Sequence, residues 1–309
     1  MPTAEPTGQN SPCPSIERLA RSMRKSLKKF ISRVPELMFG EDPAAVHDVR
    51  VSSRRLQQGL AVLFPKPRPV KVRRLRKTLR RIRALLADWR GCDVMSNLVA
   101  LEERRAEGPA EREAWQLVRD YLGEKRERQV ARAREKLVKY DLDDFARRAR
   151  KLLDRPTQNE DREAWKTHWQ VAMDKAWTQW HAALTQAQQT RNASDIHQFR
   201  IVTKRLRYRI ELAHELGDKD KATLIHELKQ LQDATGLWHD RQDIYEVMAE
   251  AVARPELLLA EPGKVRLLLS ELEKDRLQQR QVLDEIFRMA SAVPSWKRLK
   301  SSSGEVPAG

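Results

Sequence analysis

The stretch VHDVRVSSRRLQQGL at residues 46–60 recurs further along the chain as IHQFRIVTKRLRYRI at residues 196–210. In both copies the apolar side chains fall three and four positions apart, which is the spacing of a helix with one buried face. One histidine and three basic residues recur in phase beside those apolar positions. Self-similarity at a fixed offset indicates a duplicated structural unit. The sequence therefore predicts two homologous helical halves related by a pseudo-twofold axis.

The repeat continues into the helix that follows each copy, where Leu79 corresponds to Leu228 and Trp89 corresponds to Trp238. The other segments also have a helical period, and none carries a convincing strand signal. Helices are predicted at residues 16–31, 45–64, 70–87, 92–106, 110–139, 142–153, 161–190, 194–216, 219–236, 240–254 and 264–290. These patterns predict an all-α fold built from helical bundles.

Composition places the boundaries of the two halves. We predict a first half at 16–155, a polar linker at 156–160 and a second half at 161–298. The polar, proline- and serine-containing ends predict disordered tails at 1–15 and 299–309. No apolar stretch has the length of a signal peptide core or a membrane span, so we expect no membrane partner and a cytoplasmic location.

Charge is distributed unequally between the halves. The net charge is +16, residues 1–155 carry all of it, and residues 156–309 are neutral overall. From Val49 to Ala87 the chain has thirteen lysines and arginines and no acidic residue. A run of like charge is often only a solvated face, but here no carboxylate offsets the repulsion. The pattern favours a binding site for a long anion.

Helical geometry places the basic residues of this region in stripes. On the repeated helix, His47, Arg50 and Arg54 share a side that flanks the apolar face, and Arg55 extends it. The second copy has an equivalent stripe, which consists of His197, Arg200, Lys204, Arg205 and Arg207. In the helix predicted at 70–87, arginines follow the apolar stripe one residue behind, at Arg73, Arg76, Arg80 and Arg83. Adjacent arginine stripes suit a repeating anion such as polyphosphate or a nucleic-acid backbone, because the guanidinium fork binds phosphate oxygens bidentately.

The pattern His-x-x-Arg-Val-x-x-x-Arg-Arg-Leu at 47–56, with its second copy at 197–206, resembles the CHAD (conserved histidine α-helical domain) family. The segments at 86–94 and 231–240 are similar to two further motifs of that family. The resemblance covers residues 16–295 and implies two four-helix-bundle halves with a basic central cavity that binds inorganic polyphosphate. The leading hypothesis is therefore a polyphosphate-binding protein, for which we expect a location that includes polyphosphate granules.

Carried over by position, the resemblance assigns to the cavity the residues His47, Arg50, Arg54, Arg55, His197, Arg200, Lys204 and Arg205. Arg90 matches the motif arginine, while Asp93 and Asp240 match motif carboxylates. The sequence departs from the family at Ala87 and Gly91, which predicts a reshaped loop there. A CYTH domain, often joined to the family, requires Glu-x-Glu-x-Lys. The nearest stretch, at 271–275, ends in aspartate, so we expect a stand-alone CHAD protein.

The residues leave several alternatives open. His47 and His197 fit packing residues or phosphate ligands, and metal or acid–base chemistry less well. The other histidines lack recognised metal-ligand spacing, no carboxylate cluster stands out, and no phosphate loop is present, so we expect no cofactor, no metal, no catalytic residue and no enzyme. The tryptophans at 165, 169, 177 and 180 fit a core face better than a contact surface. The alternative function is nonspecific nucleic-acid binding, which the lack of aromatics among the arginines disfavours.

Overall fold

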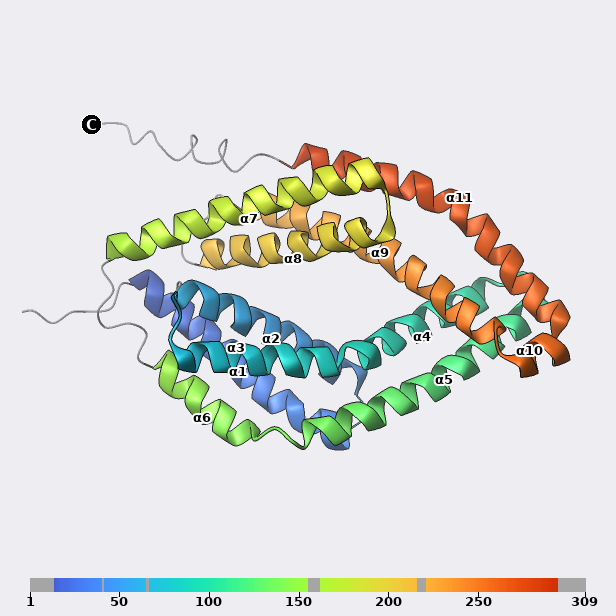
Figure 1. Cartoon of the computed structure of the whole chain (residues 1–309), viewed down its shortest axis with the longest axis horizontal. Coiled ribbons are helices and arrows are strands. Elements are labelled where there is room, and N and C mark those ends of the chain that lie inside the picture. Colours follow the sequence, from blue (N-terminus) through green and yellow to red (C-terminus); the bar gives the residue numbers. More distant parts are fainter. Residues whose placement is uncertain (1–13, 41, 65–66, 155–161, 216–220, 294–309) are drawn as a thin grey trace, which may run out of the picture.

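A computed structural model describes residues 14–40, 42–64, 67–154, 162–215 and 221–293, and within these ranges every regular element is a helix (Figure 1). In chain order the helices are α1 (Pro14–Phe39), α2 (Pro43–Leu63), α3 (Val70–Leu85), α4 (Ala87–Arg105), α5 (Pro109–Leu137), α6 (Leu142–Leu153), α7 (Arg162–Thr190), α8 (Ala193–Glu215), α9 (Ala222–Val252), α10 (Pro255–Ala260) and α11 (Pro262–Ala292). The all-α prediction is confirmed. None of the described helices has both the length and the apolar character needed to span a bilayer.

Three predicted boundaries were wrong, and the short helix α10 was not predicted. Helix α1 does not end at residue 31 but continues to Phe39. The break predicted between residues 236 and 240 is absent, because α9 runs through Gly236 with Thr235 and Trp238 buried on either side of it. The Thr235 hydroxyl donates to the Leu231 carbonyl oxygen at 2.8 Å, so this polar side chain is satisfied within the turn that precedes Gly236. In addition, α4 begins at Ala87 directly after α3, so the segment expected to be a loop is the first turn of a helix.

The predicted tail at 1–15 lies outside the described residues up to residue 13, and α1 begins at Pro14. The predicted linker at 156–160 and the predicted tail at 299–309 lie wholly outside them.

Buried apolar side chains form three clusters. The first lies among α1, α2, α3, α6 and the end of α5, and the second lies among α7, α8, α9 and α11. The third joins α4 and α5 to α9 and α11 around residues such as Trp115, Val118 and Ile244. In Figure 1 these four long helices converge toward α10, away from the side where α2 and α8 lie. The third cluster fixes the α1–α6 part of the chain against the α7–α11 part.

The tryptophan face of α7 is largely core. Trp180 is fully buried, its ring stacks on Trp177 at a centroid distance of 5.5 Å, and its Nε1 donates to Thr203 Oγ1 at 3.0 Å. Trp169 is half-buried and packs against both the first and the second cluster. The side chain of Trp165 lies outside the described part of the chain. The buried indoles of α7 hold α8, and so orient the basic stripe that α8 carries on its other side.

Helix α1 holds α2 from the face opposite to its basic stripe. At Gly59 the two helices come so close that an added Cβ would lie 1.7 Å from the Met23 Sδ. Met23 is itself buried in the first core. The absence of a side chain at Gly59 therefore lets α1 pack closely enough on α2 to hold the polar side of α2 toward α8.

Candidate functional site

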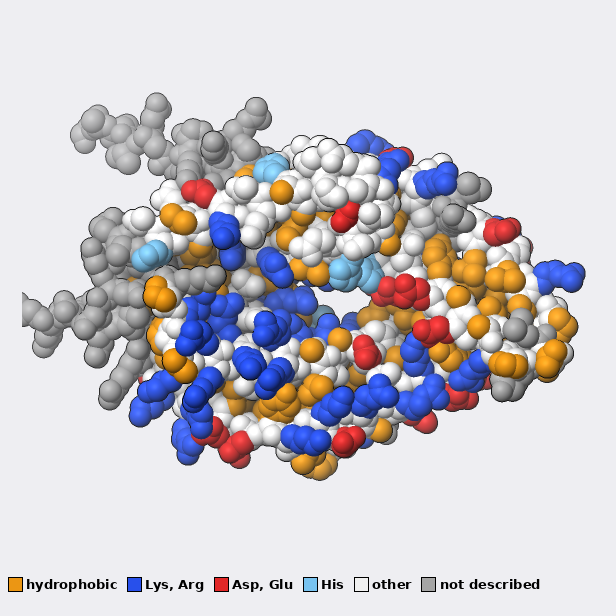
Figure 2. Space-filling model, in the orientation of Figure 1, with side chains coloured by type: hydrophobic (Ala, Val, Ile, Leu, Met, Phe, Trp, Pro, Cys, Tyr) orange, Lys and Arg blue, Asp and Glu red, His pale blue; other side chains and the backbone are white. Residues whose placement is uncertain are grey.

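A cavity of about 750 Å³ lies between the helix pair α2–α3 and the helix pair α7–α8. Its lining contains seven arginines and two lysines, and none of the described lining residues is acidic. The basic residues are Arg54, Arg68, Arg76, Arg80, Arg83, Lys175, Lys204, Arg205 and Arg209. Figure 2 shows blue side chains gathered over α2 and α3, beside an opening through the molecule. We call the cavity between these two helix pairs the arginine cavity.

Helix periodicity explains why arginines line it. Helix α3 buries Val72, Leu75, Leu79 and Ile82 in the first core. An arginine follows each of these positions, so the four arginines form a stripe beside the buried face. Three of them line the cavity, at Arg76, Arg80 and Arg83. The fourth, Arg73, lines an adjoining pocket of about 580 Å³ that shares Arg76 and Arg80 with the cavity.

Neutral oxygen atoms hold several of the guanidinium groups in place. Arg83 Nη2 donates to Gln57 Oε1 at 2.7 Å, and Arg209 Nη1 donates to the Ala172 carbonyl oxygen at 2.6 Å. Such acceptors fix the orientation of a guanidinium without cancelling its charge. The arginines are thus ordered in the free protein and still carry positive charge for an incoming anion.

Some of these side chains keep unused donors. Within the described part of the chain, four buried guanidinium nitrogens lack a hydrogen-bond partner, and they are Arg68 Nε, Arg76 Nε, Arg83 Nη1 and Arg200 Nε. The first three belong to residues that line the cavity. Leaving a buried donor unpaired costs about 1–3 kcal/mol, and more for a charged group. An anion with several oxygen acceptors would remove that cost.

Burial, together with crowded positive charge, lowers the pKa values of basic groups inside the cavity. Burial, and then the charges of neighbouring arginines, lower the pKa of Arg76 and of Arg83 to about 10. Both therefore stay charged at neutral pH. Burial, followed by the charges of Arg200 and Arg54, lowers the pKa of Lys204 to about 7. Half of the Lys204 side chains are neutral at that pH in the free protein.

The repeated stripes of α2 and α8 lie within electrostatic reach of each other. The pKa of Arg50 falls to about 10 through burial and then through Arg54, Arg83, Arg90 and Arg200. Arg50 also donates to the Arg83 carbonyl oxygen at 2.8 Å, which ties α2 to α3. Arg50 and Arg54 of the first copy and Arg200 of the second therefore belong to one positive field beside the cavity.

Both repeated histidines are exposed, so neither is a core packing residue. Partial loss of hydration and then the charge of Arg90 lower the pKa of His47 below its ordinary value. His197 has a lowered pKa as well, through partial burial and then contact with His239. Both imidazoles are mainly neutral at neutral pH in the free protein.

The structure brings together only part of the set predicted from the sequence. Among the predicted residues, those that line the arginine cavity are Arg54, Arg76, Arg80, Arg83, Lys204 and Arg205. Arg73 lines the adjoining pocket, and Arg50, His197 and Arg200 line neither space but interact electrostatically with residues of the cavity lining. His47 and Arg90 lie outside both linings and interact electrostatically with Arg50. Arg55 lies instead in a pocket with α1 residues, and Arg207 pairs with Glu211 and donates to Gln232 Oε1 at 2.9 Å.

Among the basic residues and histidines of the lining, sequence reasoning missed four, which are Arg68, His168, Lys175 and Arg209. Arg209 follows Arg205 by four positions on α8, and this spacing could have revealed it. Arg68 lies between α2 and α3 in a proline-rich segment, where no helical period applies. His168 and Lys175 lie on α7, whose face toward the cavity no motif marks.

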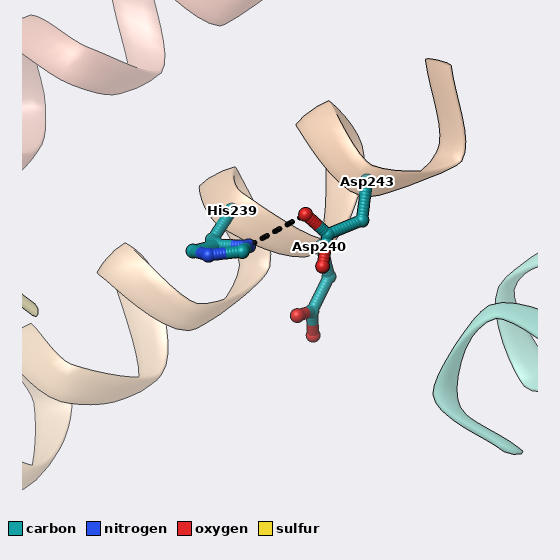
Figure 3. A group of neighbouring side chains, drawn as sticks. All are labelled: His239, Asp240 and Asp243. Carbon is teal, nitrogen blue, oxygen red and sulfur yellow. Dashed lines mark ion pairs between the residues drawn. The ribbon is translucent and has the colours of Figure 1, made fainter. Parts of the chain in front are cut away.

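The described residues also include one group with the composition of a metal site. His239, Asp240 and Asp243 of α9 offer ligand atoms that all lie within 4.8 Å of one another (Figure 3). The sequence offered a weak signal for it, because His239 and Asp243 are four positions apart on one helix face. The other carboxylate that matches a family motif, Asp93, is not part of this group. Its Oδ1 lies 2.7 Å from Arg126 Nε, with which it forms an ion pair.

Comparisons with known proteins agree on the fold. The family model described as the CHAD domain matches residues 21–249. The crystal structure of the CHAD domain from the plant Ricinus communis aligns with a TM-score of 0.63 and 19% identity, covering 90% of this chain and 92% of that one. PptA from Streptomyces chartreusis aligns with a TM-score of 0.64 and 17% identity, covering 90% and 99%. No curated protein matches the chain.

Proposed function

The chain belongs to the CHAD family, and from that premise we propose that its arginine cavity binds inorganic polyphosphate. The proposal is carried by one observation, which is the set of half-buried guanidinium groups that neutral oxygens hold in place and that keep unpaired N–H donors. The general association of the family with polyphosphate supports it. Such a cavity lacks internal counter-charge, so its preferred occupant is a dense anion.

The shape of the basic surface favours a polymer over a single phosphate group. The arginine cavity continues into the adjoining pocket through Arg76 and Arg80, and Arg73 and Lys77 extend it along α3. Arginines three and four positions apart on one helix repeat at intervals of about 5–6 Å. A chain of phosphates presents oxygen atoms along such a row at every point.

We also propose that both halves contact the polymer near a pseudo-twofold axis between α2 and α8. Arg54 of α2 and Lys204 of α8 both line the cavity, and they occupy equivalent positions of the sequence repeat. Most of the attraction comes from the first half, which supplies Arg68 and the α3 arginines.

Polyphosphate is favoured over nucleic acid by the scarcity of aromatic rings. Trp169 is the one aromatic carbocycle among the described lining residues. Proteins that hold single strands stack successive bases on several aromatic side chains. Polyphosphate has no bases, so it needs no aromatic side chains for stacking.

We propose binding without turnover, in the cytoplasm and on polyphosphate granules. The described cavity lining offers no carboxylate to hold magnesium against a phosphate, which phosphoryl transfer requires. Incubation of the protein with polyphosphate and magnesium is expected to release no phosphate. If the wild-type protein releases phosphate and a His197→Ala variant does not, this part of the proposal is overturned.

The direct test is a titration of the full chain with polyphosphates of increasing length at several salt concentrations. Affinity is expected to rise with length until the cavity and the adjoining pocket are filled, and then to level off. It is expected to fall steeply with salt, because each neutralised phosphate releases a counterion. Equal affinities for triphosphate and long chains would contradict the proposal.

A further inference from the structure

We infer that His239, Asp240 and Asp243 of α9 form a binding site for a divalent transition-metal ion, with His197 of α8 as the residue that orients His239. The assignment does not depend on polyphosphate binding. It rests on the chemistry of four side chains that lie together at the edge of the basic region.

The three ligand side chains come from adjacent turns of one rigid helix. His239 and Asp243 are four positions apart, and Figure 3 shows the imidazole and the Asp243 carboxylate facing each other across that turn, with Asp240 alongside. His239 Nδ1 lies 2.9 Å from Asp243 Oδ1. Ligand atoms on a regular helix need little rearrangement to meet one ion, so the site is largely preformed.

His239 Nδ1 has an unused bonding capacity. Although it lies close to Asp243, the contact lacks the geometry of a hydrogen bond, and Nδ1 is buried without a hydrogen-bond partner. The other ring nitrogen, Nε2, contacts His197 Nδ1. A proton on Nε2, shared with His197, leaves the Nδ1 lone pair for a metal ion and fixes the ring plane, as hydrogen-bonded neighbours do at metal sites.

The Asp240 and Asp243 carboxylates lie close together at the edge of the basic region, with Arg200 near Asp240. The contact between Arg200 Nη2 and Asp240 Oδ1 is long, at 3.9 Å. A divalent ion between the carboxylates would neutralise both of them. Asp240 and Asp243 are two neighbouring negative charges in a chain whose net charge is +16.

The mixture of donors selects the metal. Magnesium and calcium are usually held by oxygen ligands alone, whereas an imidazole nitrogen suits zinc, cobalt, nickel and iron. One imidazole and two carboxylates leave coordination positions for water or for another anion. The site therefore fits zinc, and cobalt can replace zinc as a spectroscopic probe.

Zinc titration of the full chain without an affinity tag and without polyphosphate tests the site. Isothermal calorimetry is expected to give one ion per chain, and cobalt is expected to give a visible absorption spectrum of low coordination number. His239→Ala and Asp243→Asn are each expected to weaken binding at least about 10-fold, and His197→Ala by roughly 10–100-fold. Asp243 is half-exposed, so its variant tests the site even where His239→Ala perturbs folding.

Two matched controls lie on the same helix. His226 and Asp233 of α9 are exposed and outside the cluster. His226→Ala and Asp233→Asn are expected to leave zinc affinity unchanged. The assignment is overturned by a wild-type chain that shows no saturable zinc or cobalt binding, or by an affinity that His239→Ala and Asp243→Asn leave intact. Because polyphosphate is absent, neither result depends on the proposed function.

Discussion

Replacing Arg80 and Arg205 together by glutamate is expected to weaken polyphosphate binding by at least roughly 100-fold at physiological salt, about 2.7 kcal/mol. Both side chains line the arginine cavity, one from α3 and one from α8. A hydrogen bond to a charged group contributes about 1.5–3 kcal/mol, so the loss of two such contacts accounts for this change. Both residues are exposed, so the new carboxylates need not be buried. Fluorescence anisotropy with labelled polyphosphate measures the effect.

The matched control changes the same amount of charge elsewhere. Arg128 and Arg132 are exposed on α5 and do not line the cavity. Their double substitution by glutamate is expected to weaken binding only a few-fold, through the net charge. An equal loss in both double variants would show that overall charge, and not the cavity, drives binding. Arg50 is a poorer probe, since it holds the Arg83 carbonyl oxygen and its loss would disturb the fold.

Polyphosphate affinity is expected to fall roughly 15-fold between about pH 7 and pH 8.5, because of Lys204. Its pKa is about 7 in the free protein. A bound polyanion favours the ammonium form and raises that pKa. Above pH 7, binding must therefore take up a proton, and the affinity falls as the pH rises. In the free protein His47 and His197, whose pKa values lie below the ordinary one, are mainly neutral throughout this window.

Two conservative substitutions separate Lys204 from other titrating groups. Lys204→Arg is expected to flatten the pH profile, because the guanidinium remains charged across the window. Lys175→Arg is the control, since Lys175 lines the same cavity from α7 but is exposed. It is expected to keep the wild-type slope. A flat wild-type profile, or a slope that persists in Lys204→Arg, would contradict the assigned role of Lys204.

The helical architecture could be predicted because it follows from periodicity. The apolar positions of α3, from Val72 to Ile82, have the spacing of one buried face, and all four are buried. Because one arginine directly follows each of these positions, the same helical geometry places the four arginines in a stripe beside the buried face. The repeat at 46–60 and 196–210 likewise predicts the basic stripes of α2 and α8 from the sequence alone.

Other features depend on tertiary contacts that no local pattern records. The third core joins Trp115 of α5 to Ile244 of α9, which are far apart in sequence. Arg55 and Arg207 share the motif of the cavity residues, yet rotation along the helix carries them to other surfaces. The contact of His239 with His197 was hidden for the same reason, because it joins two different helices.

The central claim is that the cavity selects polyphosphate and not merely negative charge. The most direct measurement is competition at physiological salt, in which unlabelled polyphosphate and duplex DNA, matched in total charge, each displace labelled polyphosphate from the full chain. Preorganised, half-buried arginines predict that polyphosphate displaces the label at a charge concentration at least roughly tenfold lower than DNA does, about 1.4 kcal/mol. Displacement by DNA at the same charge concentration would contradict the account.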